Sequence, residues 1–420
     1  MAQISPFKGW RYNDDLIDDF TKVIVPPYDV ITAGEQDQYY SMSPNNYIRI
    51  NLNRSEGEER YINASKALVD LQQKGVLKRE AEKAIYILSQ SFDHDGKMVN
   101  RVGCICALKL SELDADVLPH EQTIEKHLDD RYKLMDATQA NSGQIFMCYQ
   151  DEQLVLEKIY NSLNTAPEID SILDNIRTQL WVVTDTQIIE NFKNCLQGKK
   201  VVIADGHHRY KTALRYNNDH HKLRGTDKVM VILVNSSNPG MSVLPTHRLL
   251  SGIDIAHDEI IEKLKTHFSM DIFEGPKLLL ESFEMDGLKK GQMGVYHRES
   301  NTALLLNFLI WDKLNEMFSD QCRASRELDT NIMHRFIMKD VFGVDTSNQQ
   351  DLKKLSYMRG NKPALDLLNA ETDYDVACFI QPPSLDEIFT IAKAGETMPQ
   401  KSTYFFPKVY SGLVTRCFSE

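Results

Sequence analysis

The stretch from residue 200 to residue 216 constrains the fold most, because it has the pattern of a strand, a tight turn and a helix in succession. An apolar, β-branched run ends at Ile203, and apolar residues from Tyr210 onward recur at helical spacing. Gly206 allows the backbone to approach a ligand closely, and the N–H groups that open a helix favour an anion. The pattern therefore predicts a phosphate-binding turn.

The side chains of this turn suit a phosphate group. Arg209 carries a fork of donors that matches phosphate oxygens, and His207 and His208 stand beside it. Strand-Asp-Gly-helix junctions are also common as plain connections, and adjacent histidines alone indicate little. The turn by itself therefore leaves a phosphate site and a structural junction equally open.

Composition excludes several classes of protein. The 420 residues carry 48 Lys and Arg against 60 Asp and Glu, a net charge of −12, so we expect no nucleic-acid partner, while a small anion needs only a local cluster of charge. The seven scattered cysteines form no Cys-x-x-Cys pair, which indicates free thiols in a reducing compartment. Since no run of 18 apolar residues occurs, we expect no membrane partner and a cytoplasmic protein.

The order of predicted elements indicates an α/β protein in the broad (α+β) sense with three lobes. Residues 1–115 form a mixed lobe, in which residues 47–50 alternate like a strand. Residues 116–250 alternate strand and helix, which indicates an α/β core, with a helical insertion near 150–180. Residues 251–420 form a C-terminal α/β lobe.

Two further segments are candidates for chemistry. Glu121 follows Pro-His at what we expect to be the start of a helix, where it can act as a general base or as a cap, although a solvated helix face explains this segment as well. Zinc does not fit, because His120 and His127 lie seven positions apart and the metalloprotease pattern needs four. Near the C-terminus, residues 401–403 (Lys-Ser-Thr) offer one charge and two hydroxyls to a phosphate, or form a polar surface loop.

Three segments together resemble one family. Residues 205–209 (Asp-Gly-His-His-Arg) are similar to the signature box of the ParB/sulfiredoxin superfamily, in the version found in SerK-type free L-serine kinases. Residues 119–122 (Pro-His-Glu-Gln) resemble the segment that holds the catalytic glutamate of those kinases, followed by a polar loop at 138–143. Residues 399–403 resemble their C-terminal phosphate-contacting loop. With residues 26–29 and 245–248, these segments also resemble a large bacterial family of about this length and of formerly unknown function.

The resemblance implies a ParB/sulfiredoxin-like core with an additional N-terminal lobe and a C-terminal lobe whose tail returns to the site. It implies transfer of a phosphoryl group from ATP or ADP to the hydroxyl of free L-serine, giving O-phosphoserine, with Glu121 taking the hydroxyl proton. Asp205 would be catalytic and would orient Mg²⁺ or its water. The residues that would hold the nucleotide phosphates are Gly206, His207, His208, Arg209, Lys401, Ser402, Thr403 and Thr138. The acceptor would lie against His120, His247 and Arg248.

A second interpretation stays open. Within the same superfamily, a nucleotide-binding or nucleotide-hydrolysing switch would lack small-molecule kinase activity. The base Glu121 favours the kinase, and the missing basic field disfavours a DNA clamp. A sulfiredoxin-like reductase needs a cysteine where this chain has His207. No Walker-type, dinucleotide-binding or nucleophile-elbow motif is present, so a kinase here would need an unrelated fold.

Overall fold

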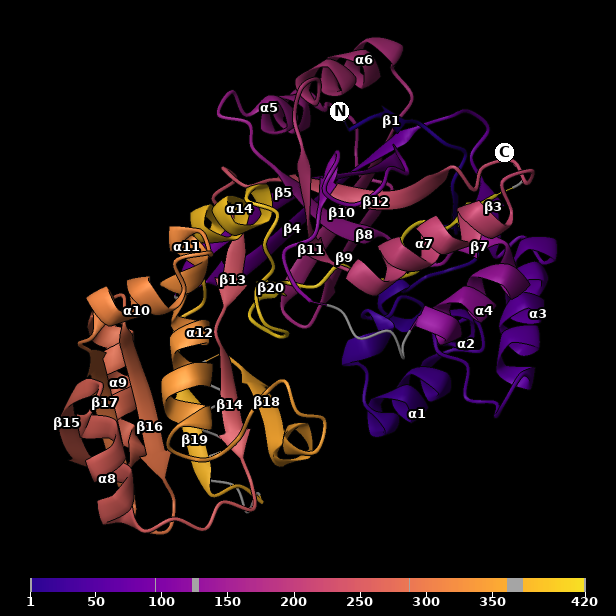
Figure 1. The fold of residues 1–420 in the computed structure, drawn as a ribbon. Coiled ribbons are helices and arrows are strands. Elements are labelled where there is room, and N and C mark those ends of the chain that lie inside the picture. The colour runs from indigo at the N-terminus through magenta and orange to yellow at the C-terminus, as the bar shows by residue number, and fades with distance from the viewer. Residues whose placement is uncertain (1, 95, 123–127, 287, 361–372, 419–420) are drawn as a thin grey trace. The chain divides into compact units, whose positions relative to one another are not determined.

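The computed structural model describes residues 2–94, 96–122, 128–286, 288–360 and 373–418 (Figure 1). The chain divides into two compact units. Unit 1 contains Met1–Pro119, Thr123–Ser242 and Pro407–Glu420, and unit 2 contains His120–Gln122 and Val243–Phe406. Both combine helices with sheets, so the α+β class predicted from the sequence is confirmed. The boundaries of the three predicted lobes stay a prediction.

Unit 1 is built on a mixed sheet with strand order β6-β11-β8-β12-β5-β4-β10-β9, and β1 pairs with β5. β11 runs parallel to β6 and β12 parallel to β8, whereas the other pairs are antiparallel. All five residues of β8 are buried, as expected of an inner strand covered on both faces. The strands are β1 (Ile4–Ser5), β4 (Ile85–His94), β5 (Lys97–Lys109), β6 (Val117–Leu118), β8 (Ile145–Tyr149), β9 (Ile169–Leu173), β10 (Ile176–Val183), β11 (Val201–Asp205) and β12 (Lys228–Asn235).

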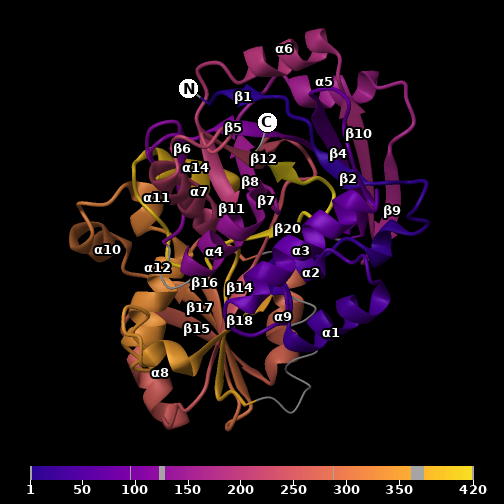
Figure 2. The same cartoon turned by 90° about the vertical axis from the view of Figure 1, so that its right-hand side faces the viewer.

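The helices of unit 1 form two groups. Figures 1 and 2 both show α5 and α6 side by side, and their apolar residues join the core of the sheet. In Figure 1, α4 lies between α3 and α7 and packs against both. The helices are α1 (Ala33–Met42), α2 (Ile48–Asn51), α3 (Glu59–Gln73), α4 (Leu128–Thr138), α5 (Val155–Ser162), α6 (Thr186–Cys195) and α7 (His207–Asp219), with short 3₁₀ turns η1 (Phe20–Lys22) and η2 (Tyr28–Val30).

Two sequence predictions in unit 1 are wrong. Residues 47–50, expected as a strand, lie in and just before helix α2, and burial of Tyr47, Ile48 and Ile50 explains the apolar pattern without a strand. The expected helical insertion near 150–180 is helical only in α5. It continues as the hairpin β9–β10, whose turn residues Asp174 and Asn175 have φ values of 52° and 60°. Two successive residues with positive φ are typical of a tight hairpin turn.

The last segment of the chain belongs to unit 1. It contacts widely separated parts of the N-terminal half: Ser411 forms backbone hydrogen bonds with Val25, and Thr415 forms them with Trp10. Two small antiparallel ladders complete the unit, one of β21 (Arg416–Cys417) with β7 (Ala140–Asn141) and one of β2 (Trp10–Tyr12) with β3 (Leu77–Arg79). The C-terminal segment therefore stabilises unit 1 by pairing with several parts of its N-terminal half.

Unit 2 has an antiparallel sheet with strand order β15-β17-β16-β19-β14-β18. Ser384 caps α14 in a capping box with Glu387. The strands are β14 (Thr246–Leu250), β15 (Phe268–Glu274), β16 (Gln292–His297), β17 (Thr302–Phe308), β18 (Leu355–Arg359) and β19 (Val376–Phe379). The helices are α8 (His257–Lys265), α9 (Pro276–Asp286), α10 (Trp311–Met317), α11 (Arg323–Arg326), α12 (Asp329–Ile332), the π-helix η4 (Met333–Lys339), the 3₁₀ turn η5 (Asp351–Lys354) and α14 (Leu385–Lys393).

Two short strands, β13 (Ser242–Leu244) and β20 (Tyr404–Phe406), pair with each other where the chain passes from one unit into the next. In the part of the chain that the structure describes, no helix is long and apolar enough to cross a membrane.

Candidate functional site

The predicted strand-turn-helix around Gly206 is confirmed. β11 ends at Asp205 with a shift of register after Ile203, and α7 begins at His207. Gly206 has φ 97° and ψ 31°, a left-handed conformation that favours glycine. A Cβ atom here would lie 2.9 Å from Nε and Nη2 of Arg209, so a side chain would also displace the guanidinium. Because residue 206 has no side chain, the guanidinium of Arg209 can lie close to the backbone of the turn.

Three charged groups surround the turn. Nη1 of Arg209 donates to the carbonyl oxygen of Gln144 at 2.6 Å, and Nη2 donates to Oδ2 of Asp205 at 3.1 Å. Nζ of Lys408 lies 3.4 Å from Oδ1 of the same carboxylate. Burial alone would raise the pKa of Asp205, but the charges of Lys408 and Arg209 outweigh it and hold the pKa well below its usual range. Asp205 is therefore ionised and orients two cations at the start of α7.

Lys408 was missed from the sequence, and its position depends on two buried side chains of the sheet. Nη2 of Arg101 donates to the side-chain oxygen of Gln90 and to the carbonyl oxygen of Pro407. Nε2 of Gln90 in turn donates to the carbonyl oxygen of Lys408 at 3.2 Å. These bonds fix the peptide groups on both sides of the α-carbon of Lys408. The one signal in the sequence was the position of Lys408 just after the Lys-Ser-Thr segment.

We expect Lys408→Met to lower the free energy of unfolding by about 1–3 kcal/mol at pH 7, because a partly buried carboxylate loses one of two cationic partners. The depressed pKa of Asp205 gives stability that is present above the unfolded-state pKa of about 4 and is lost as the pH falls below it. The difference between variant and wild type should therefore shrink below about pH 4. Urea unfolding at a series of pH values measures both effects.

Lys193→Met is the matched control for this prediction, because Nζ of Lys193 pairs with Glu190 at the surface of α6. An exposed pair of this kind contributes about 0–1 kcal/mol. If Lys408→Met lowered the free energy of unfolding no more than Lys193→Met at every pH, the ion pair with Asp205 would not contribute to stability.

In unit 2, the structure brings Glu121 together with the Lys-Ser-Thr loop, defined here as residues 399–403. Met398 donates its N–H to the carbonyl oxygen of His120 at 2.8 Å, so the two segments run side by side. Oε1 of Glu121 accepts the backbone N–H of Lys401 at 2.7 Å, and Lys401 has a positive φ of 57°. The carboxylate thus fixes the loop at its one left-handed residue.

The hydroxyl groups of this loop already have partners. Oγ of Ser402 donates to the carbonyl oxygen of Pro399 at 2.6 Å. Oγ1 of Thr403 lies 2.9 Å from Nε2 of the fully buried His120, which is also 3.9 Å from Oε2 of Glu121. The side chain of Lys401 is exposed. His120 therefore links the predicted base to the loop, and Lys401 is the group of the loop that faces solvent.

Arg248 lies beneath the same loop and is fully buried. Nη1 donates to the carbonyl oxygen of Thr246 and Nη2 to that of Lys401 at 3.3 Å, while Nε has no hydrogen-bond partner among the described residues. Burial lowers the pKa of Arg248 to about 10, and the charge of Glu121 acts in the opposite direction. Arg248 is therefore a buried cation that supports the loop backbone.

Two predicted residues have structural partners. Nδ1 of His247 accepts the N–H of Ile380 at 3.2 Å, and its ring packs against Phe379 within the sheet of unit 2. Thr138, the last residue of α4, donates its hydroxyl to the carbonyl oxygen of Leu134 at 2.7 Å. His207 is buried and His208 half-buried in the first turn of α7. The predicted residues thus form two groups, one within each unit.

Comparison with known proteins places the chain in a family. A profile described as "Protein of unknown function (DUF1015)" matches residues 4–330, which is more than half of the chain. The chain belongs to the DUF1015 family. A search of curated protein sequences found no match.

Solved structures similar to this DUF1015 protein include a free serine kinase in complex with AMP, with 11% identity, a TM-score of 0.34 and coverage of 71% of this chain and 89% of that chain. SbnI from Staphylococcus aureus with a C-terminal truncation has 13% identity, a TM-score of 0.35 and coverage of 74% and 81%. A conserved hypothetical protein from Pyrococcus furiosus has 13% identity, a TM-score of 0.31 and coverage of 69% and 87%. At these scores the likeness does not assign an activity.

Magnesium fits poorly at Asp205 in this DUF1015 protein. Each oxygen of the carboxylate faces a cation, Arg209 on one side and Lys408 on the other. In the described residues, no group of three or more His, Cys, Asp or Glu side chains could hold a metal ion. Since Mg²⁺ is bound through one or two carboxylates and substrate phosphates, we derive no step through a protein-bound metal here.

Proposed function

We propose that the protein is a small-molecule kinase that transfers a phosphoryl group from ATP or ADP to the hydroxyl of free L-serine, giving O-phosphoserine. The proposal includes membership of the core in the ParB/sulfiredoxin superfamily. The resemblance of three sequence segments to SerK-type kinases supports it, together with the local geometry of those segments. Magnesium would then arrive with the nucleotide phosphates rather than at a preformed carboxylate site.

The observation that carries the proposal is the setting of Glu121. Its carboxylate is mostly shielded from solvent, oriented by the N–H of Lys401 and close to His120. A general base has to be held in a fixed orientation toward the proton that it accepts, and a backbone donor on one oxygen provides this. A glutamate that served only as a solvated helix residue would not need such a partner.

The proposal assigns the phosphates to the turn of unit 1. The first N–H groups of α7 and the partial positive charge of the helix start favour an anion, and Arg209 and Lys408 add two cations. Phosphoryl transfer passes through a loose, anionic transition state, so positioning and neutralisation of charge supply most of the catalysis. Gly206, His207 and His208 contribute the backbone of this anion site. The contacts of Lys401, Ser402 and Thr403 with phosphate stay a prediction.

In the proposed reaction, the serine hydroxyl oxygen attacks the terminal phosphorus of the nucleotide. The bond from that phosphorus to the bridging oxygen breaks, and ADP or AMP leaves as the anion. Glu121 takes the hydroxyl proton. His120 and Arg248 hold the loop that orients Glu121, and we keep them, with His247, as candidates for contact with the acceptor.

The test is incubation of the purified full chain with ATP or ADP, Mg²⁺ and L-serine, followed by ³¹P NMR and mass spectrometry for O-phosphoserine. L-Alanine, which lacks the hydroxyl, is the matched control. We expect a phosphorylated product with L-serine and none with L-alanine. Hydrolysis of nucleotide without transfer to any free hydroxy amino acid would favour the nucleotide-dependent switch instead.

A further inference from the structure

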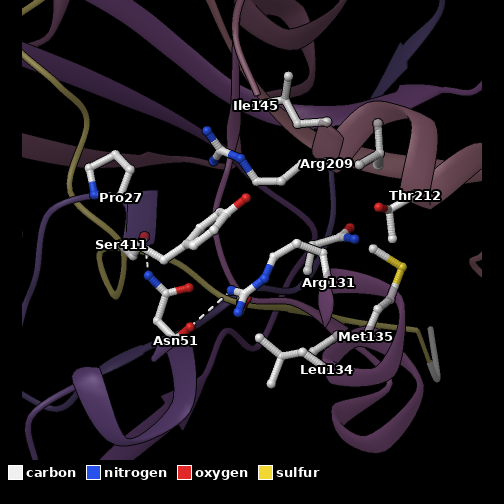
Figure 3. A pocket seen from close by; sticks show the side chains of 15 residues that line it. Pro27, Asn51, Arg131, Leu134, Met135, Ile145, Arg209, Thr212 and Ser411 are labelled. Atoms are coloured by element: carbon white, nitrogen blue, oxygen red, sulfur yellow. Dashed lines mark hydrogen bonds between the residues drawn. The ribbon is translucent and has the colours of Figure 1, made fainter. Parts of the chain in front are cut away.

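Unit 1 contains a pocket that shares Arg209 with the phosphate turn and is otherwise not explained by the assignments above. Its cavity volume is about 40 Å³, and two arginines, Arg131 and Arg209, line it (Figure 3). None of its lining residues is acidic. They are Pro27, Tyr28, Asn51, Arg131, Leu134, Met135, Ala140, Asn141, Ser142, Gly143, Ile145, Arg209, Thr212, Val229 and Ser411.

Arg131 is held in place from several sides. Its guanidinium carbon lies 3.9 Å from the centre of the Tyr28 ring, and Nη1 donates to the carbonyl oxygen of Asn51 at 2.9 Å. Nε donates to Oδ2 of Asp130 at 2.8 Å, from outside the pocket lining. Because its position is fixed before any ligand arrives, little conformational entropy is lost when it binds an anion.

Arg209 extends the phosphate turn into the same pocket. Its Nη1 would lie 3.5 Å from a Cβ atom at Gly143, and Oγ of Ser411 would lie at 3.1 Å, so glycine keeps this wall open. Both guanidiniums act on the Tyr28 hydroxyl, whose pKa burial raises and their charges lower. Both arginines line the same small space.

Thr212 supplies an independent observation. Its side chain is fully buried on α7, and its Oγ1 has no hydrogen-bond partner among the described residues. Figure 3 shows this hydroxyl pointing into the space that Arg131 and Met135 border. A buried hydroxyl without a hydrogen-bond partner destabilises a protein. Because this hydroxyl lies on the wall of a pocket, it indicates a ligand that supplies the missing hydrogen bond.

We propose that this pocket is an oxyanion subsite, in which a carboxylate or phosphate group of a small ligand binds Arg131 and Arg209 and accepts a hydrogen bond from Thr212. The apolar side chains of Leu134, Met135 and Ile145 would then contact the non-polar part of the ligand. Insofar as it names the ligand, the proposal rests on the proposed kinase function. The oxyanion is the carboxylate of the acceptor or a phosphate of the nucleotide.

Thr212→Val tests the subsite in the full chain, because it exchanges the hydroxyl for a methyl group of similar shape. Affinities for L-serine, for ADP and for inorganic phosphate are measured by calorimetric titration. We expect Thr212→Val to weaken binding of the oxyanion ligand about 5-fold and to leave the unliganded protein as stable as wild type or more so. Arg131→Lys, which keeps the charge and loses the fork, should weaken the same ligand about 10-fold or more.

Thr178→Val is the matched control, because Thr178 in β10 is also buried with an unpartnered hydroxyl and does not line the pocket. A loss confined to L-serine assigns the carboxylate, and a loss confined to ADP assigns the phosphate. If Thr212→Val changes no affinity, phosphate included, the subsite proposal is overturned. Binding of inorganic phosphate is measured without turnover, so failure of kinase activity alone is a separate result.

Discussion

Glu121→Gln is expected to lower the rate of O-phosphoserine formation by about 10²–10⁴-fold, the usual contribution of a general base. Glutamine keeps an oxygen that can accept the N–H of Lys401, so the Lys-Ser-Thr loop should keep its conformation. The amide cannot take the hydroxyl proton. The substitution therefore separates the chemical role of Glu121 from its role in holding the loop, and the measurement is turnover together with the thermal unfolding midpoint.

Glu396→Gln is the matched control in the same unit, because Oε1 of Glu396 also accepts a backbone N–H, that of Cys322, at 2.6 Å. It should keep full turnover. Glu121→Ala removes both roles, so it should lose activity and also lower the unfolding midpoint. Full turnover in Glu121→Gln would show that the carboxylate is only an anchor of the loop.

Arg209→Met should weaken binding of ADP by about 10–100-fold, because charge-assisted hydrogen bonds to a phosphate contribute about 1.5–3 kcal/mol. The substitution also leaves Asp205 with Lys408 as its one cationic partner at the turn, among the contacts described above. Direct titration with ADP measures the affinity, and urea unfolding shows whether the variant is folded.

Arg215→Met provides the comparison on the same helix. Arg215 is more than half exposed and pairs with Asp129 at the surface, so its loss should leave ADP binding unchanged. If both Arg209→Met and Arg215→Met bound ADP as tightly as wild type, the turn at Gly206 would not be part of the nucleotide site.

The turn at Gly206 could be predicted from the sequence because its determinants are local. A β-branched run, a glycine in a left-handed conformation and a helical repeat follow one another within a few residues. The capping box of α14 is equally local, because Ser384 and Glu387 lie three positions apart. The alternation at 47–50 misled because Tyr47, Ile48 and Ile50 are all buried in and just before a short helix, so apolar residues recur without a strand.

The partners of the candidate residues could not be predicted locally. Glu121 meets Lys401 across 280 positions of sequence, and Asp205 meets Lys408 across more than 200. Motif resemblance connected the first pair. For the second pair, the one signal was the position of Lys408 a few residues after the Lys-Ser-Thr loop. Thr212 appears in the sequence as an ordinary helix residue, and only its burial without a hydrogen-bond partner singles it out.

The path of the chain has a consequence for synthesis. Unit 2 is inserted into unit 1, whose last segment pairs with Val25, Trp10 and β7. Domains generally fold in order as a chain emerges from the ribosome, at about 5–20 residues per second. Asp205 and Lys408 are more than 200 residues apart in the chain, so a nascent chain has an incomplete anion site until Lys408 has been translated.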